Sequence, residues 1–366
     1  MRKLMYRLFA LFFNLNRIFP VKRTRVALLA PHPLSPNDSL SRIETFLKEK
    51  GGFEIIKIEV PRVKTPGKLL RFMFCDSASL ARAKFVFLND NFMPLGDMKF
   101  SSEAVVTQLW HGEGAFKKFG FDLNLDEGTK EILKKSAGKY SYVTCTGENV
   151  KKIYAGAFGV DESKVIATGS PRDDFLFKNN NTGRLREDFD RKFPACKGKK
   201  LVLYAPTFRE NEADDANILN SFDAEKLTAR LGEEYAVLIK LHPRVHSGSV
   251  NAGLTDVTGV DISLLTLICD TLITDYSSVC MDFALLNKKC VFYAYDLEKY
   301  EAERSFYFDY EDYVPGEVVK NSDDLPAAIK NPPNAGKTGK FREFNFDYFD
   351  DGNTQRLYEA VIQANL

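Results

Sequence analysis

Short apolar runs alternate along this chain with longer segments in which apolar residues recur every three or four positions. The runs are rich in β-branched and aromatic residues, which is typical of buried strands. In the first half they cover residues 25–30, 53–60, 84–89, 104–109, 142–146 and 164–168. The segments predicted to be surface helices between them are 39–50, 129–136 and 149–158. Such alternation favours a parallel sheet flanked by helices.

The second half of the chain repeats the pattern. Its strand candidates are residues 200–205, 235–241, 256–259, 271–274 and 290–293. A polar stretch between residues 177 and 200, with Asn179–Gly183 and Pro194, predicts a domain boundary. We therefore expect an α/β protein with two Rossmann-like domains facing one another across a cleft. Their expected bounds are 21–190 and 191–345, followed by a C-terminal helix over 346–366.

Residues 1–20 form a separate basic and aromatic segment. Its uninterrupted apolar run, Leu8–Phe13, is far shorter than the roughly 20 residues that a spanning helix needs. The pattern predicts an amphipathic helix that lies on an anionic membrane surface, which would make the protein peripheral, on the cytoplasmic face of the cell membrane. The alternative is a helix docked on the protein's own surface.

Composition narrows the function classes. The net charge is +1 and 44% of residues are hydrophobic, so the chain can build a packed core and shows no basic block of the kind that binds nucleic acid. Its six cysteines are widely spaced and form no Cys-x-x-Cys pair, which favours free thiols in a reducing compartment and excludes a typical zinc motif. We expect neither a metal site nor a cofactor.

Polar motifs begin where several of the apolar runs end. These motifs are Trp110–Gly112, Pro206–Arg209, His242–Arg244 and Asp275–Ser278. Because the carboxyl ends of parallel strands share one edge of a sheet, we expect these groups to collect where ligands bind. Ser277 or Ser278 can cap the helix that follows, and a helix N-terminus favours phosphate. The set predicts a substrate that contains a pyrophosphate.

Five motifs in this order resemble the CDP-glycerol glycerophosphotransferases of teichoic acid synthesis. They are Leu109–Lys118, Gly169–Asp173, Leu203–Arg209, Lys240–Pro243 and Thr274–Ser278, within a resemblance that covers about residues 107–316. The resemblance implies a GT-B fold. It also implies transfer of a polyol phosphate, glycerol phosphate first of all, from CDP-glycerol or a similar CDP-polyol to an acceptor hydroxyl, with release of CMP.

The resemblance also implies roles for individual residues. His111 matches the family's proposed general base, and His242 would stabilise charge on the departing CMP. The residues expected to bind the donor are Trp110, Gly112, Arg172, Pro206, Thr207, Arg209, Lys240, Leu241, Ser277, Ser278 and Asp282. The acceptor would be a lipid-linked saccharide or a polyol-phosphate chain, and the family reaction is expected to need no metal.

Two other functions fit parts of this pattern. A GT-B glycosyltransferase that uses a nucleotide sugar would share the pyrophosphate site but gives no reason for the Trp-His-Gly and Pro-Thr-Phe-Arg motifs. A non-catalytic membrane scaffold would be expected to lack His111 or His242.

The Gly112–Lys117 segment departs from the Gly-Thr-Pro-Leu-Lys of polymerase-like members and is closer to primase-like members. Glycerol versus ribitol, and primase versus polymerase, stay open.

Overall fold

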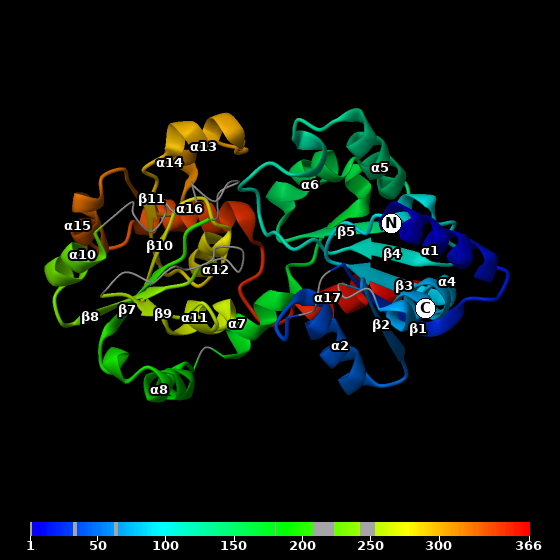
Figure 1. Cartoon of the computed structure of the whole chain (residues 1–366), viewed down its shortest axis with the longest axis horizontal. Helices are drawn as coiled ribbons and strands as arrows, with labels where there is room; N and C mark the ends of the chain where they lie inside the picture. Colours follow the sequence, from blue (N-terminus) through cyan, green and yellow to red (C-terminus); the bar gives the residue numbers. More distant parts are fainter. Residues whose placement is uncertain (1, 32–34, 62–64, 180, 208–222, 242–252) are drawn as a thin grey trace. The chain divides into compact units, whose positions relative to one another are not determined.

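The computed structural model describes the chain except for residues 1, 32–34, 62–64, 180, 208–222 and 242–252. The chain divides into two compact units (Figure 1), of which the first comprises residues 1–174 and 345–366 and the second residues 175–344. The division therefore falls at Asp174, not near residue 190 as expected. The reason is that α8 (Gly183–Lys192) packs on α11 (Ile262–Ile268) in the second unit.

The first unit contains a six-stranded parallel sheet with the order β2-β1-β3-β4-β5-β6. Its strands are β1 (Lys22–Ala30), β2 (Glu54–Glu59), β3 (Ala83–Leu88), β4 (Val105–Gln108), β5 (Tyr142–Cys145) and β6 (Val165–Ala167). The helices that lie between these strands in the sequence include α2 (Ser39–Lys50), α5 (Glu127–Ala137) and α6 (Lys151–Phe158). All six strands and these three helices coincide with predicted segments to within a few residues.

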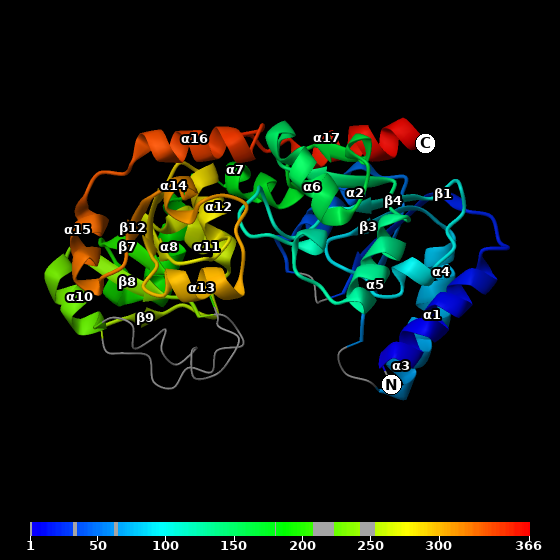
Figure 2. The ribbon, with the colours of Figure 1, turned by 90° about the horizontal axis from the view of Figure 1, so that it is seen from above.

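The end of the chain returns to the first unit. The helix α17 (Asn353–Leu357) lies against α2, although the two are far apart in sequence (Figures 1 and 2). Leu357 and Val361 are buried in the same hydrophobic cluster as Val26 and Phe85 of the sheet. The C-terminal segment is therefore part of the core of the first unit.

The N-terminal helix α1 (Arg2–Asn16) is docked on the first unit. It lies alongside α4 (Ser77–Ala81) and the π-helical turn Arg71–Asp76 that follows α3 (Pro66–Leu70), as Figure 2 shows. Phe9 and Phe13 are fully buried. One face of α1 is therefore docked on the protein's own surface, and the opposite face is exposed. None of the helices in the described part of the chain is long and apolar enough to cross a membrane.

The second unit contains another six-stranded parallel sheet, with the order β12-β11-β10-β7-β8-β9. The strands are β7 (Lys200–Tyr204), β8 (Tyr235–Ile239), β9 (Thr255–Asp256), β10 (Thr271–Thr274), β11 (Lys289–Tyr293) and β12 (Glu317–Val319). Its remaining helices are α10 (Ala224–Leu231), α12 (Val279–Leu285), α13 (Leu297–Glu303), α14 (Tyr310–Tyr313), α15 (Leu325–Lys330) and α16 (Ala335–Asn345), and α7 (Asp174–Lys178) begins at the division.

The strand orders locate a switch point in each sheet. Read from β9, the second sheet has the 3-2-1-4-5-6 order of dinucleotide-binding folds, and its order reverses between β7 and β10. In the first sheet the order reverses between β1 and β3. Ligands of such folds bind beyond the carboxyl ends of the strands at this point. The topology therefore singles out the residues that follow β7 and β10.

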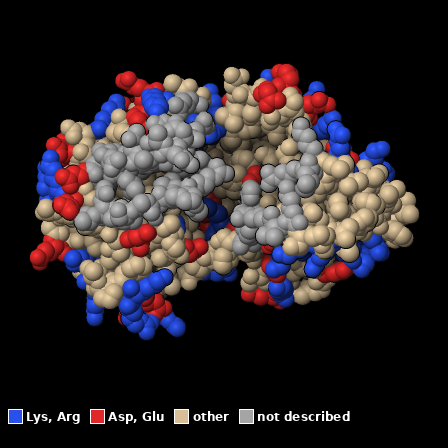
Figure 3. Space-filling view, viewed as in Figure 1, with Lys and Arg blue, Asp and Glu red and all other residues tan. Residues whose placement is uncertain are grey.

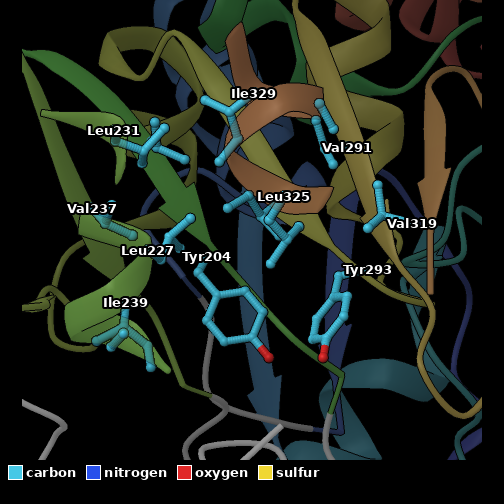
Figure 4. Close-up of a cluster of buried hydrophobic side chains, with 14 of the residues drawn as sticks. Tyr204, Leu227, Leu231, Val237, Ile239, Val291, Tyr293, Val319, Leu325 and Ile329 are labelled. Carbon is cyan, nitrogen blue, oxygen red and sulfur yellow. The ribbon is translucent and has the colours of Figure 1, made fainter. Parts of the chain in front are cut away.

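One core cluster of the second unit fills the space between the sheet and the helices α10 and α15. Figure 4 shows its members, which include Leu227 and Leu231 of α10 and Leu325 and Ile329 of α15. The phenol oxygens of Tyr204 and Tyr293 lie at one end of this cluster, where β7 and β11 end. The strands end at this side of the cluster, and the loops that carry the predicted site residues begin there.

Candidate functional site

Trp110 and His111 follow β4 through a left-handed turn. Trp110 has a φ of 62°, which is unusual for a bulky residue, and its N–H donates to Oε1 of the buried Gln108 at 2.8 Å. The Trp110 and His111 ring centroids are 4.0 Å apart. The side chain of His111 is 56% exposed. The turn thus presents the imidazole at the carboxyl edge of the first sheet.

Arg172 forms an ion pair with Glu113, two residues after His111. The Arg172 Nε–H donates to Oε1 of Glu113, whose side chain is buried. Burial opposes ionisation of Glu113, but the adjacent guanidinium outweighs it and holds the pKa of this carboxyl below its usual value. Glu113 therefore helps to hold Arg172, which was expected to bind donor phosphate. The sequence had shown Glu113 only as a departure from the family pattern.

The carboxylates of Glu113 and Asp173 lie within 4.8 Å of one another, which is close enough to share a cation. Arg172 lies beside both of them. Its guanidinium supplies the positive charge that two buried carboxylates need. Within the first unit, Arg172 thus offsets the charge of these two carboxylates.

Asn345, at the start of the C-terminal segment, holds the loop that carries His111. Its Oδ1 accepts from Ala115 N–H at 2.8 Å, and its carbonyl accepts from the Thr146 hydroxyl at 2.6 Å. The same hydroxyl oxygen accepts from Gly114 N–H at 3.1 Å. Gly114 has a φ of 56°, and a Cβ there would lie 2.3 Å from Asn345 Oδ1. The position therefore requires glycine.

A second contact joins the C-terminal segment to the Gly169–Asp173 motif. The carboxylate of Asp174 accepts from the N–H groups of Asn353 and Thr354 at 2.9 and 3.0 Å, where α17 begins. Burial raises the pKa of Asp174 above its usual value, although these bonds oppose the rise. A Cβ at Gly169 would lie 1.9 Å from Asn353 Oδ1. The loops of His111 and Arg172 are therefore both fixed by residues 345–354.

In the second unit, the Asp275–Ser278 turn lies at the switch point between β7 and β10. Asp275 Oδ1 accepts from Thr207 N–H at 2.7 Å and from Tyr276 N–H at 2.6 Å. Asp275 therefore orients the turn and ties it to the end of β7. Among the described residues, the Ser277 hydroxyl makes only a long contact of 3.4 Å with Val279 N–H, and Ser278 makes no side-chain cap bond. The expected serine cap is thus weak.

Aromatic residues support this turn. The Tyr276 ring stacks on that of Tyr300, with centroids 3.7 Å apart and planes 18° apart. Its hydroxyl donates to Asp296 Oδ1 at 2.9 Å, and the buried Tyr310 hydroxyl donates to the Asp275 carbonyl at 2.7 Å. Tyr300 and Tyr310 therefore both support the turn.

The remaining predicted donor residues lie nearby in the second unit. Pro206 follows β7, and the buried Asp282 lies on α12, one turn after the serines. The Lys240 ammonium donates to the carbonyls of Thr258 and Val260 at 2.9 and 2.6 Å, and burial lowers its pKa. Leu241 is buried after β8. Arg209 and His242 lie outside the described residues.

The structure thus brings the predicted residues into two groups, one in each unit. Trp110, His111, Gly112 and Arg172 gather at the carboxyl edge of the first sheet. Those of the second unit follow the neighbouring strands β8, β7 and β10. Asn345, Asp174 and Gln108 were missed, because buried amides and carboxylates that bind loops leave no local sequence pattern. The one signal in the sequence was Gly114 itself, because glycine often marks a backbone position with positive φ.

Comparisons with known proteins place the chain in a family. The family model described as CDP-Glycerol:Poly(glycerophosphate) glycerophosphotransferase matches residues 47–363. The chain is 32% identical to a teichoic acid poly(ribitol-phosphate) polymerase of Bacillus spizizenii, over 99% of this chain and 60% of that protein. It is 35% identical to a teichoic acid glycerol-phosphate transferase of Staphylococcus aureus, over 63% of this chain and 62% of that protein.

A solved structure shows the same fold. The wall teichoic acid polymerase TagF has a TM-score of 0.77 and 21% identity, over 100% of this chain and 95% of that chain. This likeness confirms the GT-B class expected from the sequence. The chain spans about 60% of the length of its B. spizizenii relative, so it corresponds to only part of that protein. With the family model matched over most of its length, the chain belongs to the CDP-glycerol:poly(glycerophosphate) glycerophosphotransferase family.

Proposed function

We propose that this protein transfers a polyol phosphate from a CDP-activated donor to an acceptor hydroxyl and releases CMP, in the synthesis of teichoic acid or a related cell-surface polymer. The observation that carries the proposal is the placement of Thr207, Ser277 and Ser278 after two adjacent strands at the switch point of the second sheet. Phosphate-bearing ligands of doubly wound folds bind at this position. Family membership supplies the class of donor.

In this proposal the second unit binds the donor. Backbone N–H groups near Ser277 and Ser278, with the serine hydroxyls, would bind phosphate oxygens. Asp282 would accept a hydrogen bond from a donor hydroxyl. Lys240 is bound to two carbonyls of the segment that follows β9, so it would hold this segment and add positive charge near the pyrophosphate. Pro206, Thr207 and Leu241 would line the site.

His111 would act as the general base. The acceptor oxygen forms a bond to the phosphorus of the polyol phosphate, and the bond between that phosphorus and the bridging oxygen of CMP breaks. The acceptor's proton passes to the imidazole, and CMP leaves with the electron pair of the broken bond. Histidine suits this step because its pKa lies near working pH. Arg172, with His242, would stabilise the charge that develops on the phosphates.

The polyol is glycerol or ribitol. The two curated relatives described above are named for ribitol phosphate and for glycerol phosphate. A lipid-linked saccharide or a growing polyol-phosphate chain would supply the acceptor hydroxyl. Both donors therefore belong in the test, and so does a nucleotide sugar, the donor of the alternative glycosyltransferase function.

The test measures CMP release from CDP-glycerol and CDP-ribitol, with synthetic lipid-linked acceptors, by the wild type, His111→Gln and Asn124→Ala. Asn124 is exposed on the first unit, so its variant controls for handling and folding. We expect release by the wild type and the control, and a loss of about 100-fold or more in His111→Gln. Turnover of the nucleotide sugar alone would overturn the proposal.

A measurement of CMP release in excess chelator tests whether the reaction needs a metal. We expect the activity to persist.

We also propose that the exposed face of α1 binds an anionic membrane at the cytoplasmic face of the cell. The proposed membrane-binding face consists of Leu4, Leu11, Leu15, Ile18, Phe19, Leu70 and Phe74, which are all exposed. Phe74 packs on Phe12, with ring centroids 4.2 Å apart, so α1 and the neighbouring π-helical turn contribute to one surface. Figure 3 shows a mostly uncharged surface over α1 with Lys and Arg at its margins. Apolar and basic groups together favour an anionic bilayer.

Flotation with anionic vesicles tests this second proposal. The double variant Leu11→Gln/Leu15→Gln should lose most of its vesicle binding, because it removes apolar area without disturbing the buried Phe9 and Phe13. Ile132→Gln, an exposed apolar position on α5, is the matched control and should float like the wild type. Equal flotation of the double variant and the wild type would exclude α1 as the anchor.

A further inference from the structure

We infer that Asp90 is a positioning residue for His111, which keeps the proton of the neutral imidazole on Nδ1 and leaves Nε2 to take the proton of the acceptor. The inference rests on the proposed role of His111 as the base. Neither the sequence motifs nor the family resemblance pointed to Asp90, which lies 21 positions before His111.

The two residues meet because β3 and β4 are neighbours in the first sheet. Leu88 is paired with Gln108, and the N–H of Leu109 donates to the carbonyl of Leu88 at 2.7 Å. The segments that follow, residues 89–91 and 109–111, therefore leave the sheet side by side. His111 thereby comes next to Asn89 and Asp90.

Both groups that face His111 Nδ1 from this neighbouring loop are oxygens. The Asn89 carbonyl oxygen lies 3.3 Å from Nδ1, and Oδ1 of Asp90 lies 3.8 Å from it. Asp90 Oδ1 is itself held by Asn91 N–H at 2.6 Å. A carbonyl oxygen can only accept, so the contact with Asn89 is favourable only when Nδ1 carries the hydrogen. The Asp90 carboxylate favours the same tautomer.

The fully buried Gln108 fixes the two loops relative to one another. Its Nε2 donates to the Asp90 carbonyl and to the Tyr140 hydroxyl, both at 3.3 Å. Its Oε1 accepts from Trp110 N–H, and the indole of Trp110 lies against the imidazole. Backbone and ring are thus both restrained, so Nδ1 stays directed at the Asn89–Asp90 loop.

This geometry bears on the chemical step. When Nε2 takes the proton, the imidazole becomes an imidazolium whose Nδ1–H faces the carboxylate of Asp90. An opposite charge at this distance stabilises the charged form more than the neutral one. His111 is half exposed, so water screens the interaction, and we expect Asp90 to contribute about 10-fold to kcat. KM should change little, because Asp90 acts through His111 and not on the donor.

The test combines nitrogen NMR with steady-state kinetics on the full chain. In protein labelled with ¹⁵N at its four histidines, His111 is assigned by the loss of its signals in His111→Gln. At a pH where the imidazole is neutral, we expect wild-type Nδ1 to give the pyrrole-like and Nε2 the pyridine-like signal. In Asp90→Asn the Asn89 carbonyl alone still favours a hydrogen on Nδ1, so the share of this tautomer should fall below that of the wild type and kcat should fall about 10-fold. Asp97→Asn, an exposed aspartate of the same unit, should change neither.

Two outcomes would overturn the inference. One is a wild-type His111 that carries its proton on Nε2, and the other is an Asp90→Asn variant whose kcat and tautomer match those of Asp97→Asn. The NMR measurement needs no substrate, so it stands even if the protein proves inactive toward every CDP-polyol. A smaller share of the Nδ1-protonated tautomer in Asp90→Asn than in Asp97→Asn, without CMP release by the wild type, would support the positioning by Asp90 while removing the proposed reaction.

Discussion

The two groups of candidate site residues, one in each unit, differ in the contacts that hold them in place. In the first unit, the loops of His111 and Arg172 are fixed by buried polar groups of the C-terminal segment, chiefly Asn345 and the partners of Asp174. In the second unit, stacked tyrosine rings support the Asp275–Ser278 turn in addition to the hydrogen bonds of Asp275. Buried hydrogen bonds are directional and costly to leave unmade, whereas ring packing tolerates small chemical changes.

This difference indicates which single substitutions would disturb the site residues of each unit. Loss of one polar group in the first unit leaves a buried partner without its hydrogen bond. Loss of one hydroxyl in the second unit leaves most of the ring contacts intact. We therefore expect single substitutions to disable the His111 loop more readily than the Asp275–Ser278 turn.

The largest effect is expected for Asn345→Ala. This change removes the acceptor of Ala115 N–H and leaves a cavity, so unfolding free energy should fall by about 3 kcal/mol. Urea unfolding followed by tryptophan fluorescence measures it, since the single Trp110 lies near the loop. Asn124→Ala serves as the exposed control. A loss below about 1 kcal/mol would contradict the importance of this contact.

Glu113→Gln should come next, with a loss of about 2 kcal/mol at neutral pH, because it removes the charge that pairs with Arg172. The folded pKa of Glu113 is lowered, so its ionisation stabilises the protein above the unfolded pKa of about 4.3 and this stabilisation disappears as pH falls through the folded pKa. The Tm difference between wild type and variant should therefore be largest near pH 7 and shrink below about pH 4. A pH-independent difference would show that charge is not the cause.

Tyr310→Phe tests the second unit. It removes the hydroxyl that donates to the Asp275 carbonyl but keeps the buried ring, so we expect a loss of about 1 kcal/mol in the same urea experiment. The comparison between the two units fails if this variant is as destabilised as Asn345→Ala.

The smallest stability effect is expected for Ser278→Ala. Ser278 is exposed and makes no cap bond, so unfolding free energy should change by less than about 0.5 kcal/mol. If the serine binds donor phosphate as proposed, KM for the CDP-polyol should nevertheless rise about tenfold. Unchanged KM would remove Ser278 from the donor site.

Much of the fold could be predicted from sequence because strand and helix periodicity is local. Every predicted strand is present. The strand β12 escaped prediction because Glu317–Val319 is too short to show a pattern. The helical residues 66–81 were also missed, and the domain boundary was wrong because α8 belongs to the second unit.

The candidate site was predictable only in part. Motif residues such as His111 and Ser277 could be placed, because each follows a recognisable strand. Their supports could not, since Asn345 binds a residue 230 positions away and Asp174 binds one 179 positions away. Such contacts arise from tertiary packing and cannot be recognised from a short stretch of sequence.

The first unit is built from two stretches of sequence that flank the second unit, and this bears on the order of events during translation. The second unit is continuous from residue 175 to 344, so all its residues are outside the ribosome before residues 345–366 emerge. The first unit is incomplete until residues 345–366 have emerged. The usual vectorial order, N-terminal part first, would thus be reversed. In chains stalled on the ribosome with residue 344 just exposed, we expect protease resistance in the second unit and cleavage in the first. Equal resistance of both would show that the nascent first unit folds without its last segment.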